Sequence, residues 1–294
     1  DDLNNNGILF SEGDLFLTSS NQLKNTGDIA GNLVKVNSKQ TYNEGIIQGG
    51  EIQLSAEGVV NSGEVLSDGY QEISSQTIEN SGFLTGSEIV LSARKTRNTG
   101  IIHGTDRLES VYGELDNSGT LQAGELDFTL SKLSNSGQIN SIIGDIKAER
   151  LYNDGSIYAQ SILNFNKATH FENKGEIAAH NLGVYTHLLS NEGSIDSDTA
   201  TYRAKTIDNR GRISSDGNQV LYYTTLNNSG ELIGAGLTLT GDETVNQGVV
   251  TSEGFIKSIG QTFENNGIVQ GKRLEMAQVE LINKGTLLAD ELSM

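Results

Sequence analysis

Apolar and polar residues alternate in short runs along the whole chain, and these runs recur with a nearly fixed period. Each period contains the triplet Asn-x-Gly, first at Asn5 and last at Asn283, and successive asparagines are 18 to 20 residues apart. If each asparagine is counted as position 0, position +4 is Leu, Ile or Val in all sixteen repeats. Further apolar residues occupy position −2 in most repeats, and +9 and +11 in many. A regular recurrence of this kind is typical of a solenoid, in which successive repeats stack on one another.

Alternation with a period of two residues predicts strands rather than helices. We expect about three short strands per repeat, separated by Asn-x-Gly and by a second turn such as Ser67-Asp68-Gly69. One repeat cannot bury its apolar stripe alone, whereas parallel stacking buries the stripes of all repeats as one continuous core. The predicted fold is therefore an all-β, right-handed parallel β-helix of about 16 coils, with the hand taken from the usual crossover preference.

The near-invariant positions of the repeat have structural interpretations. Glycine at +2 would permit a positive φ angle and so a sharp corner, and asparagine at 0 tolerates a left-handed conformation or bonds to nearby backbone. Stacked asparagine side chains could also form a hydrogen-bonded ladder. At a coil spacing of about 4.8 Å, sixteen coils would extend on the order of 75 Å, so we expect a rod.

We interpret residues 1–294 as a single β-helical repeat domain that belongs to a longer protein, because the pattern starts and stops without an obvious polar cap. The series of repeat lengths begins again half-way, so residues 5–152 and 153–294 share a register 148 residues apart. In that register Gln71 corresponds to Gln219, and both follow a Ser-Asp-Gly triplet. This correspondence indicates an internal duplication.

Charge and composition narrow the functional classes. The formal net charge of −18 disfavours binding to nucleic acid or to an anionic membrane surface. No apolar run reaches the 18 residues that a membrane-spanning helix needs, so we expect no membrane insertion. The absence of Cys excludes disulfides, cysteine-based zinc sites and cysteine nucleophiles. Aromatic residues make up only 6%, which favours a narrow aliphatic core over a deep globular one.

The parallel β-helix also hosts glycan-acting enzymes, whose catalysis needs carboxylates clustered on neighbouring coils. The best acidic cluster here is Asp196 with Asp198, Asp208 and Asp216, and its turn-like positions fit a solvated surface better than a catalytic site. The four histidines do not share a position of the repeat, which argues against a set of metal ligands; they are His103, His170, His180 and His187. No nucleophile elbow, phosphate-binding loop or HExxH motif is present. We therefore expect no catalytic residues, metal or cofactor, and no enzymatic activity.

Aromatic residues concentrate in repeats ten to twelve. Tyr185, Arg203 and Tyr222 are expected at equivalent outward positions of three successive coils, within about 10 Å of one another, whereas Tyr202 is expected to point inward. Tyr and Arg are enriched among the residues that dominate binding energy. Ordinary packing of β-favouring residues between coils is the alternative explanation. His187 and Tyr223 lie close in register to these three residues. The candidate receptor-binding residues are therefore Tyr185, His187, Arg203, Tyr222 and Tyr223.

The repeat LxNxGxIxA, seen at Leu115–Ala123 and Leu281–Ala289, resembles a known type of sequence over essentially the whole chain. It is similar to the haemagglutinin-type repeats of filamentous haemagglutinin and related two-partner-secretion exoproteins. That family includes the large toxin-delivery proteins of contact-dependent growth inhibition. The family's N-terminal secretion domain and its C-terminal toxin are not matched here.

The resemblance implies secretion of the full-length protein by an outer-membrane transporter and an extracellular, β-helical filament at the bacterial cell surface. It also implies adhesion, with an outer-membrane receptor protein or a surface glycan of a target cell as the partner. We expect this segment to be monomeric and to bind that receptor. The alternatives are a passive stalk of the filament and, less favoured, a glycan-acting enzyme.

Overall fold

The computed structural model describes all 294 residues, and the chain is all-β. It is a solenoid of about sixteen turns in which strands of successive repeats pair in parallel, so the predicted fold class is confirmed. The right-handed sense of the coil stays a prediction. The structure contains no helix long and apolar enough to cross a membrane.

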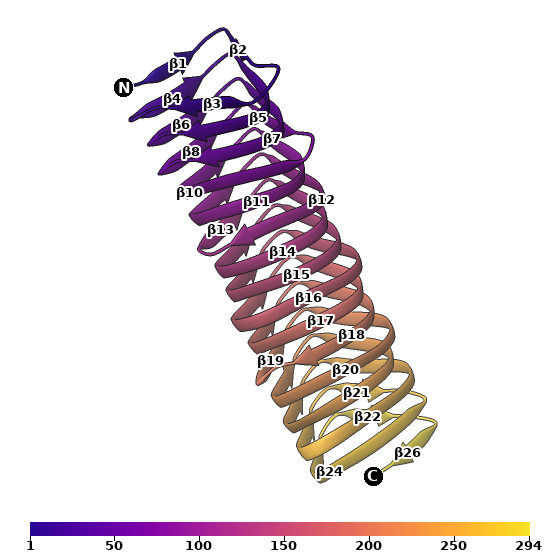
Figure 1. Cartoon of the computed structure of the whole chain (residues 1–294). Helices are drawn as coiled ribbons and strands as arrows, with labels where there is room; N and C mark the ends of the chain where they lie inside the picture. Colours follow the sequence, from indigo (N-terminus) through magenta and orange to yellow (C-terminus); the bar gives the residue numbers. More distant parts are fainter. The chain divides into compact units, whose positions relative to one another are not determined.

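The chain divides into two compact units, Asp1–Ile146 and Lys147–Met294, and within each unit the coils stack one on the next (Figure 1). The internal duplication stays a prediction, because a boundary between compact units does not test common ancestry. The first unit contains β1 Leu3–Asn5, β2 Ile8–Phe10, β3 Leu15–Thr18, β4 Gln22–Asn25, β5 Asp28–Asn37, β6 Gln40–Asn43, β7 Ile46–Ser55, β8 Gly58–Asn61, β9 Glu64–Ser67, β10 Tyr70–Asn80, β11 Phe83–Asn98, β12 Ile101–Val111, β13 Glu114–Asn117 and β14 Thr120–Asn135.

The next strand, β15 Gln138–Asn153, contains the boundary between the units. The second unit continues with β16 Ser156–Asn173, β17 Glu176–Asn191, β18 Ser194–Arg203, β19 Thr206–Asn209, β20 Arg212–Asn228, β21 Glu231–Asn246, β22 Val249–Asn265, β23 Ile268–Gln270, β24 Arg273–Asn283, β25 Thr286–Leu288 and β26 Glu291–Ser293.

The strands are longer and fewer per repeat than the sequence pattern predicts. Only the Asn-x-Gly corner interrupts the strands in every coil; β11, for example, continues from position +3 to the next asparagine without a break. The second turn ends a strand only in some repeats, as at Ser67-Asp68-Gly69 between β9 and β10. In other repeats the strand continues past the small residue at +6, as where Gly86 pairs with Gly104 and the register shifts between Gly86 and Glu88.

Inward-facing positions form the core of each unit. The aliphatic residues at +4 are at most 1% exposed in every repeat except the first and the last. The threonines that replace apolar residues at −2 are also buried, and two of them bond to a neighbouring hydroxyl. Thr41 lies 2.8 Å from the Oγ of Ser38, and Thr244 lies 2.6 Å from the hydroxyl of Tyr223. These threonines therefore point inward, like the apolar residues that they replace.

The asparagines at position 0 form the predicted ladder in both units. In the first unit the Nδ2 of each asparagine from Asn5 onwards donates to the Oδ1 of the next, up to Asn135, over 2.7–2.8 Å. In the second unit the same bonds of 2.8–2.9 Å connect Asn153 to Asn283. Most of these amides also donate to a backbone carbonyl of the next coil, as Asn25 does to Ile46 at 3.0 Å. The ladder thus connects each corner to both the side chains and the backbone of the next coil.

The expected reason for glycine at +2 is wrong. Positive φ angles occur only at Tyr112, Gly113 and Lys167, so no Asn-x-Gly corner uses one, and the asparagines are not left-handed either. Glycine is required because neighbouring coils approach closely at this corner. A Cβ on Gly211 would lie 2.1 Å from the carbonyl oxygen of Gly193 on the preceding coil.

Candidate functional site

The predicted column of outward side chains is present on the second unit. Tyr185 of β17 pairs in register with Arg203 of β18, which pairs in turn with Tyr222 of β20. Both tyrosines are 39% exposed, and the guanidinium carbon of Arg203 lies 4.6 Å from the ring centroid of Tyr222. Arg210 and Arg212, on the neighbouring corner, form ion pairs with Glu192 and Asp196, whereas Arg203 has no carboxylate partner.

The other two candidate residues lie in different environments. His187 is exposed two residues beyond Tyr185, and its carbonyl accepts a hydrogen bond from the backbone amide of Lys205. Tyr223 is buried, and its hydroxyl is hydrogen-bonded to Thr244 at 2.6 Å. Burial raises the pKa of Tyr223 to about 12. Tyr223, although a candidate receptor-binding residue, therefore does not contribute to the outward surface.

Tyr202 points inward, as predicted. It is fully buried between coils, and its hydroxyl has no hydrogen-bond partner. Burial, together with the negative charge of Asp196, raises the pKa of Tyr202 well above its ordinary value. This tyrosine belongs to the core beneath the outward column and does not contribute to its surface.

A hollow of about 320 Å³ lies beside Tyr185 on the outward face of β16, β17, β18 and β20. Its lining combines amides, hydroxyls and apolar groups and includes no charged side chain. The lining residues are Ile162, Asn164, Asn181, Leu182, Gly183, Tyr185, Thr199, Ala200, Thr201, Asn218 and Val220. We call it the amide hollow; of the candidate residues in the sequence, only Tyr185 lines it.

Gly183 creates the depth of the amide hollow. It lies at an outward position of β17, in register with Asn164 on one side and Thr201 on the other. A Cβ at Gly183 would lie 2.5 Å from the Oδ1 of Asn164 and 3.0 Å from the Cε2 of Tyr185. These two side chains lean over the space that a larger residue would fill. A glycine at an outward strand position was the one signal in the sequence for this feature.

Several polar groups of the amide hollow are available to a ligand. The side-chain amides of Asn164 and Asn218 make no hydrogen bond within the protein. The hydroxyl of Thr199 donates to the Oδ1 of Asn181 at 2.8 Å, which orients that side chain and leaves its Nδ2 without an acceptor. The site can therefore donate and accept hydrogen bonds at once.

Three of the four acidic residues that the sequence groups together have separate partners in the structure. Asp196 contacts Arg212 and Ser214, and Asp198 pairs with His180 on the preceding coil. Asp208 lies on another side of the coil. No group of three or more His, Asp or Glu side chains is arranged to hold a metal ion.

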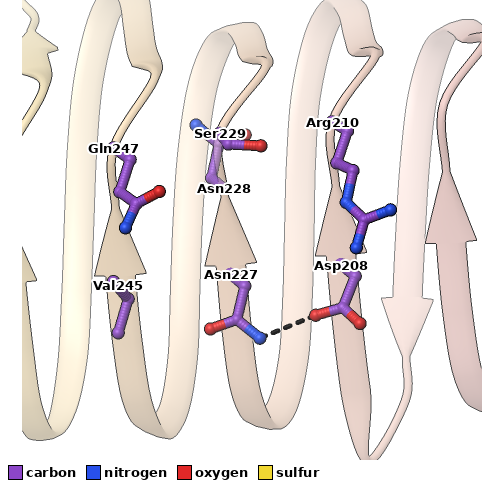
Figure 2. Close-up of a pocket in the computed structure, with 7 residues that line it drawn as sticks. All are labelled: Asp208, Arg210, Asn227, Asn228, Ser229, Val245 and Gln247. Atoms are coloured by element: carbon purple, nitrogen blue, oxygen red, sulfur yellow. Dashed lines mark hydrogen bonds between the residues drawn. The ribbon is translucent and has the colours of Figure 1, made fainter.

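A second hollow, of about 370 Å³, lies beside the Asn-x-Gly corner (Figure 2). It lies between the residues that precede and follow the ladder asparagines on three coils. Its charged groups already have partners, since Asp208 accepts a 2.6 Å hydrogen bond from Asn227 and Arg210 bonds to Glu192 at 3.1 Å. The lining residues are Asp208, Arg210, Asn227, Asn228, Ser229, Val245 and Gln247.

Comparisons of the chain with protein-family models, with curated proteins and with solved structures found no match.

Proposed function

We propose that the chain is a segment of a bacterial cell-surface exoprotein that binds a component of the outer membrane of a target cell. The repeat pattern supports the first part, through its resemblance to the haemagglutinin-type repeats of two-partner-secretion exoproteins. In that setting the segment would act in adhesion, or in toxin delivery during contact-dependent growth inhibition. A dedicated outer-membrane transporter would secrete the full-length protein.

The exposed column Tyr185–Arg203–Tyr222 carries the binding part of the proposal. Tyrosines supply a large contact area at a small cost in side-chain entropy, and Arg is the cation most often found over an aromatic ring. Because Arg203 rests on Tyr222 at 4.6 Å, its guanidinium is already oriented before a partner arrives. A cation without a carboxylate partner on a chain of net charge −18 is available to an external acceptor.

A passive stalk is the second candidate function. It is favoured by the regularity of the ladder, whose seven bonds in each unit vary between only 2.7 and 2.9 Å. Such uniformity suits a spacer, in which every coil contributes equally to length and stiffness. The two functions differ in whether the isolated segment binds cells saturably.

The test is the binding of the fluorescently labelled chain to target cells, compared with the triple variant Tyr185→Ala, Arg203→Ala and Tyr222→Ala. We expect saturable binding of the wild type and a loss of at least tenfold in affinity for the variant. A matched control replaces three apolar side chains of the first unit, which are 36–46% exposed on another outward column; they are Ile46, Phe83 and Ile101.

The control variant should bind like the wild type. Equal binding by the triple variant would overturn the assignment of the site. No saturable binding by the wild type, on any cell that the full-length exoprotein engages, would favour the stalk.

A further inference from the structure

The amide hollow beside Tyr185 indicates what kind of partner this face recognises. We infer that it binds one uncharged sugar ring of an oligosaccharide on the target-cell surface. This inference rests on the proposed function and adds the chemical class of the ligand. It is carried by the composition and the contacts of the hollow, which is a feature separate from the charged Arg203.

The residues that line the hollow offer no charged partner to an ionic ligand. Charged residues make up 20% of the chain, yet none of the eleven residues that line the hollow carries a charge. A phosphate or carboxylate buried here would lack a cation, and an ammonium group would lack an anion. A purely apolar ligand would cover the amides of Asn164 and Asn218 without offering them hydrogen bonds, which costs free energy because their bonds to water are lost. The matching ligand is therefore neutral and rich in hydroxyl groups.

The polar groups suit pairs of neighbouring hydroxyls. An asparagine side chain presents one acceptor and two donor hydrogens in a plane, so a single amide can bond to two adjacent hydroxyl groups. Three such amides line the hollow, and Asn181 is held in place by its 2.8 Å bond from Thr199. A side chain that is oriented before binding loses less entropy when the ligand arrives.

The apolar groups suit the C–H face of a sugar ring. The ring of Tyr185 leans over Gly183 and is 39% exposed, and Ile162 and Val220 add aliphatic surface to the same hollow. An aromatic ring combines a broad apolar face with a polar hydroxyl tip. A hollow of about 320 Å³ is at the lower end of the range for small-molecule sites, roughly 300–1,000 Å³, and thus suits a single ring.

The experiment measures binding of the purified chain to a panel of immobilised neutral and charged oligosaccharides. We expect saturable binding to at least one neutral member. Gly183→Val fills the hollow from its floor, and Asn218→Ala removes an exposed amide that has no partner in the protein; each should weaken this binding at least tenfold. Asn227→Ala removes an amide from the other hollow and should leave it unchanged.

Gly183→Val should fold, because the atoms nearest to its new Cβ belong to the ends of the Asn164 and Tyr185 side chains, which can rotate away. Circular dichroism and the midpoint of thermal unfolding test whether this variant folds. If the valine variant does not fold, Asn218→Ala decides, since this residue is exposed and supports no other group.

Binding of no neutral oligosaccharide, or equal binding by wild type, Gly183→Val and Asn218→Ala, would overturn the inference. Binding only to charged members, lost with Arg203→Ala, would also overturn it and would assign recognition to the column. The proposed function fails separately. If cell binding requires Arg203 and Tyr222 but survives Gly183→Val, the cell-binding role stands and the sugar site does not.

Discussion

The Asn-x-Gly corner and the outward face of repeats ten to twelve belong to the same coils, and both contain glycine. The two glycines have different neighbours and therefore different roles. At the corner, a Cβ on Gly211 would meet the carbonyl oxygen of Gly193 at 2.1 Å. On the outward face, a Cβ on Gly183 would meet the end of the Asn164 side chain at 2.5 Å. The first neighbour is backbone and the second is a mobile side chain.

This difference separates stability from recognition. A backbone oxygen cannot move without displacing the coil to which it belongs, and within each unit every coil bonds to the next through the ladder. A side-chain amide, in contrast, changes rotamer at little cost. The corner therefore tolerates one residue type, whereas the outward face is where this fold can vary its chemistry without loss of stacking.

The largest effect should come from Gly211→Ala. Overpacking against fixed backbone is expected to destabilise the second unit by about 3 kcal/mol or more, measured as a lowered midpoint of urea or thermal unfolding. Gly183→Ala is the matched control and should change the free energy of unfolding by less than about 1 kcal/mol, because only side chains must shift. Equal destabilisation by the two variants would contradict the distinction between the two glycines.

Asn209→Ala should have the next largest effect. Asn209 is 1% exposed, and its Nδ2 donates to the Oδ1 of Asn228 and to the carbonyl of Glu231. Its removal leaves the buried Oδ1 of Asn228 without this donor, at a cost of about 2 kcal/mol. Asn227→Ala, one residue from the ladder, removes an exposed amide and should cost less than about 0.5 kcal/mol. Unfolding midpoints that shift equally for both would argue that the ladder adds no stability.

Alkaline pH should destabilise the core beneath the outward column. In the folded chain burial raises the pKa of Tyr223 from 10.0 to about 12, so the folded state holds the phenol proton more tightly than the unfolded state. The stability that this difference provides is fully present below pH 10.0 and is lost as the pH rises to about 12. Tyr202 shifts in the same direction. Urea unfolding measured across this pH range should show the loss, and Tyr223→Phe should reduce it; an unchanged pH dependence in that variant would refute the assignment.

The smallest effect should distinguish the two buried hydroxyls. The hydroxyl of Tyr202 has no partner, so Tyr202→Phe should be neutral or stabilising by up to about 1 kcal/mol. The hydroxyl of Tyr223 is bonded to Thr244, so Tyr223→Phe should cost about 1 kcal/mol. Both are measured at neutral pH by chemical unfolding. A loss of stability in Tyr202→Phe would show that its hydroxyl has a bonding role.

Part of the candidate site could be predicted because the alternation of apolar and polar residues shows which side chains of a strand point inward and which point outward. Tyr185, Arg203 and Tyr222 share a repeat position once the longer repeat is allowed for, and the structure pairs them in register. The same rule applied to adjacent residues would have placed Tyr223 inward when Tyr222 points outward. Proximity in register is a weaker guide than alternation, because neighbouring residues of a strand face opposite sides.

The sequence by itself determined the repeat, the parallel stacking, the inward positions and the asparagine ladder, because each follows from a short pattern that recurs in every coil. Only the tertiary structure decided why glycine is required at the corner and where the amide hollow lies. Both depend on atoms from different coils. The register of those coils shifts at bulges, such as those between Ala159 and Ile162 and between Ser197 and Ala200. A pattern within one repeat cannot specify how far apart two repeats bring their backbones, nor which side chains meet across a bulge.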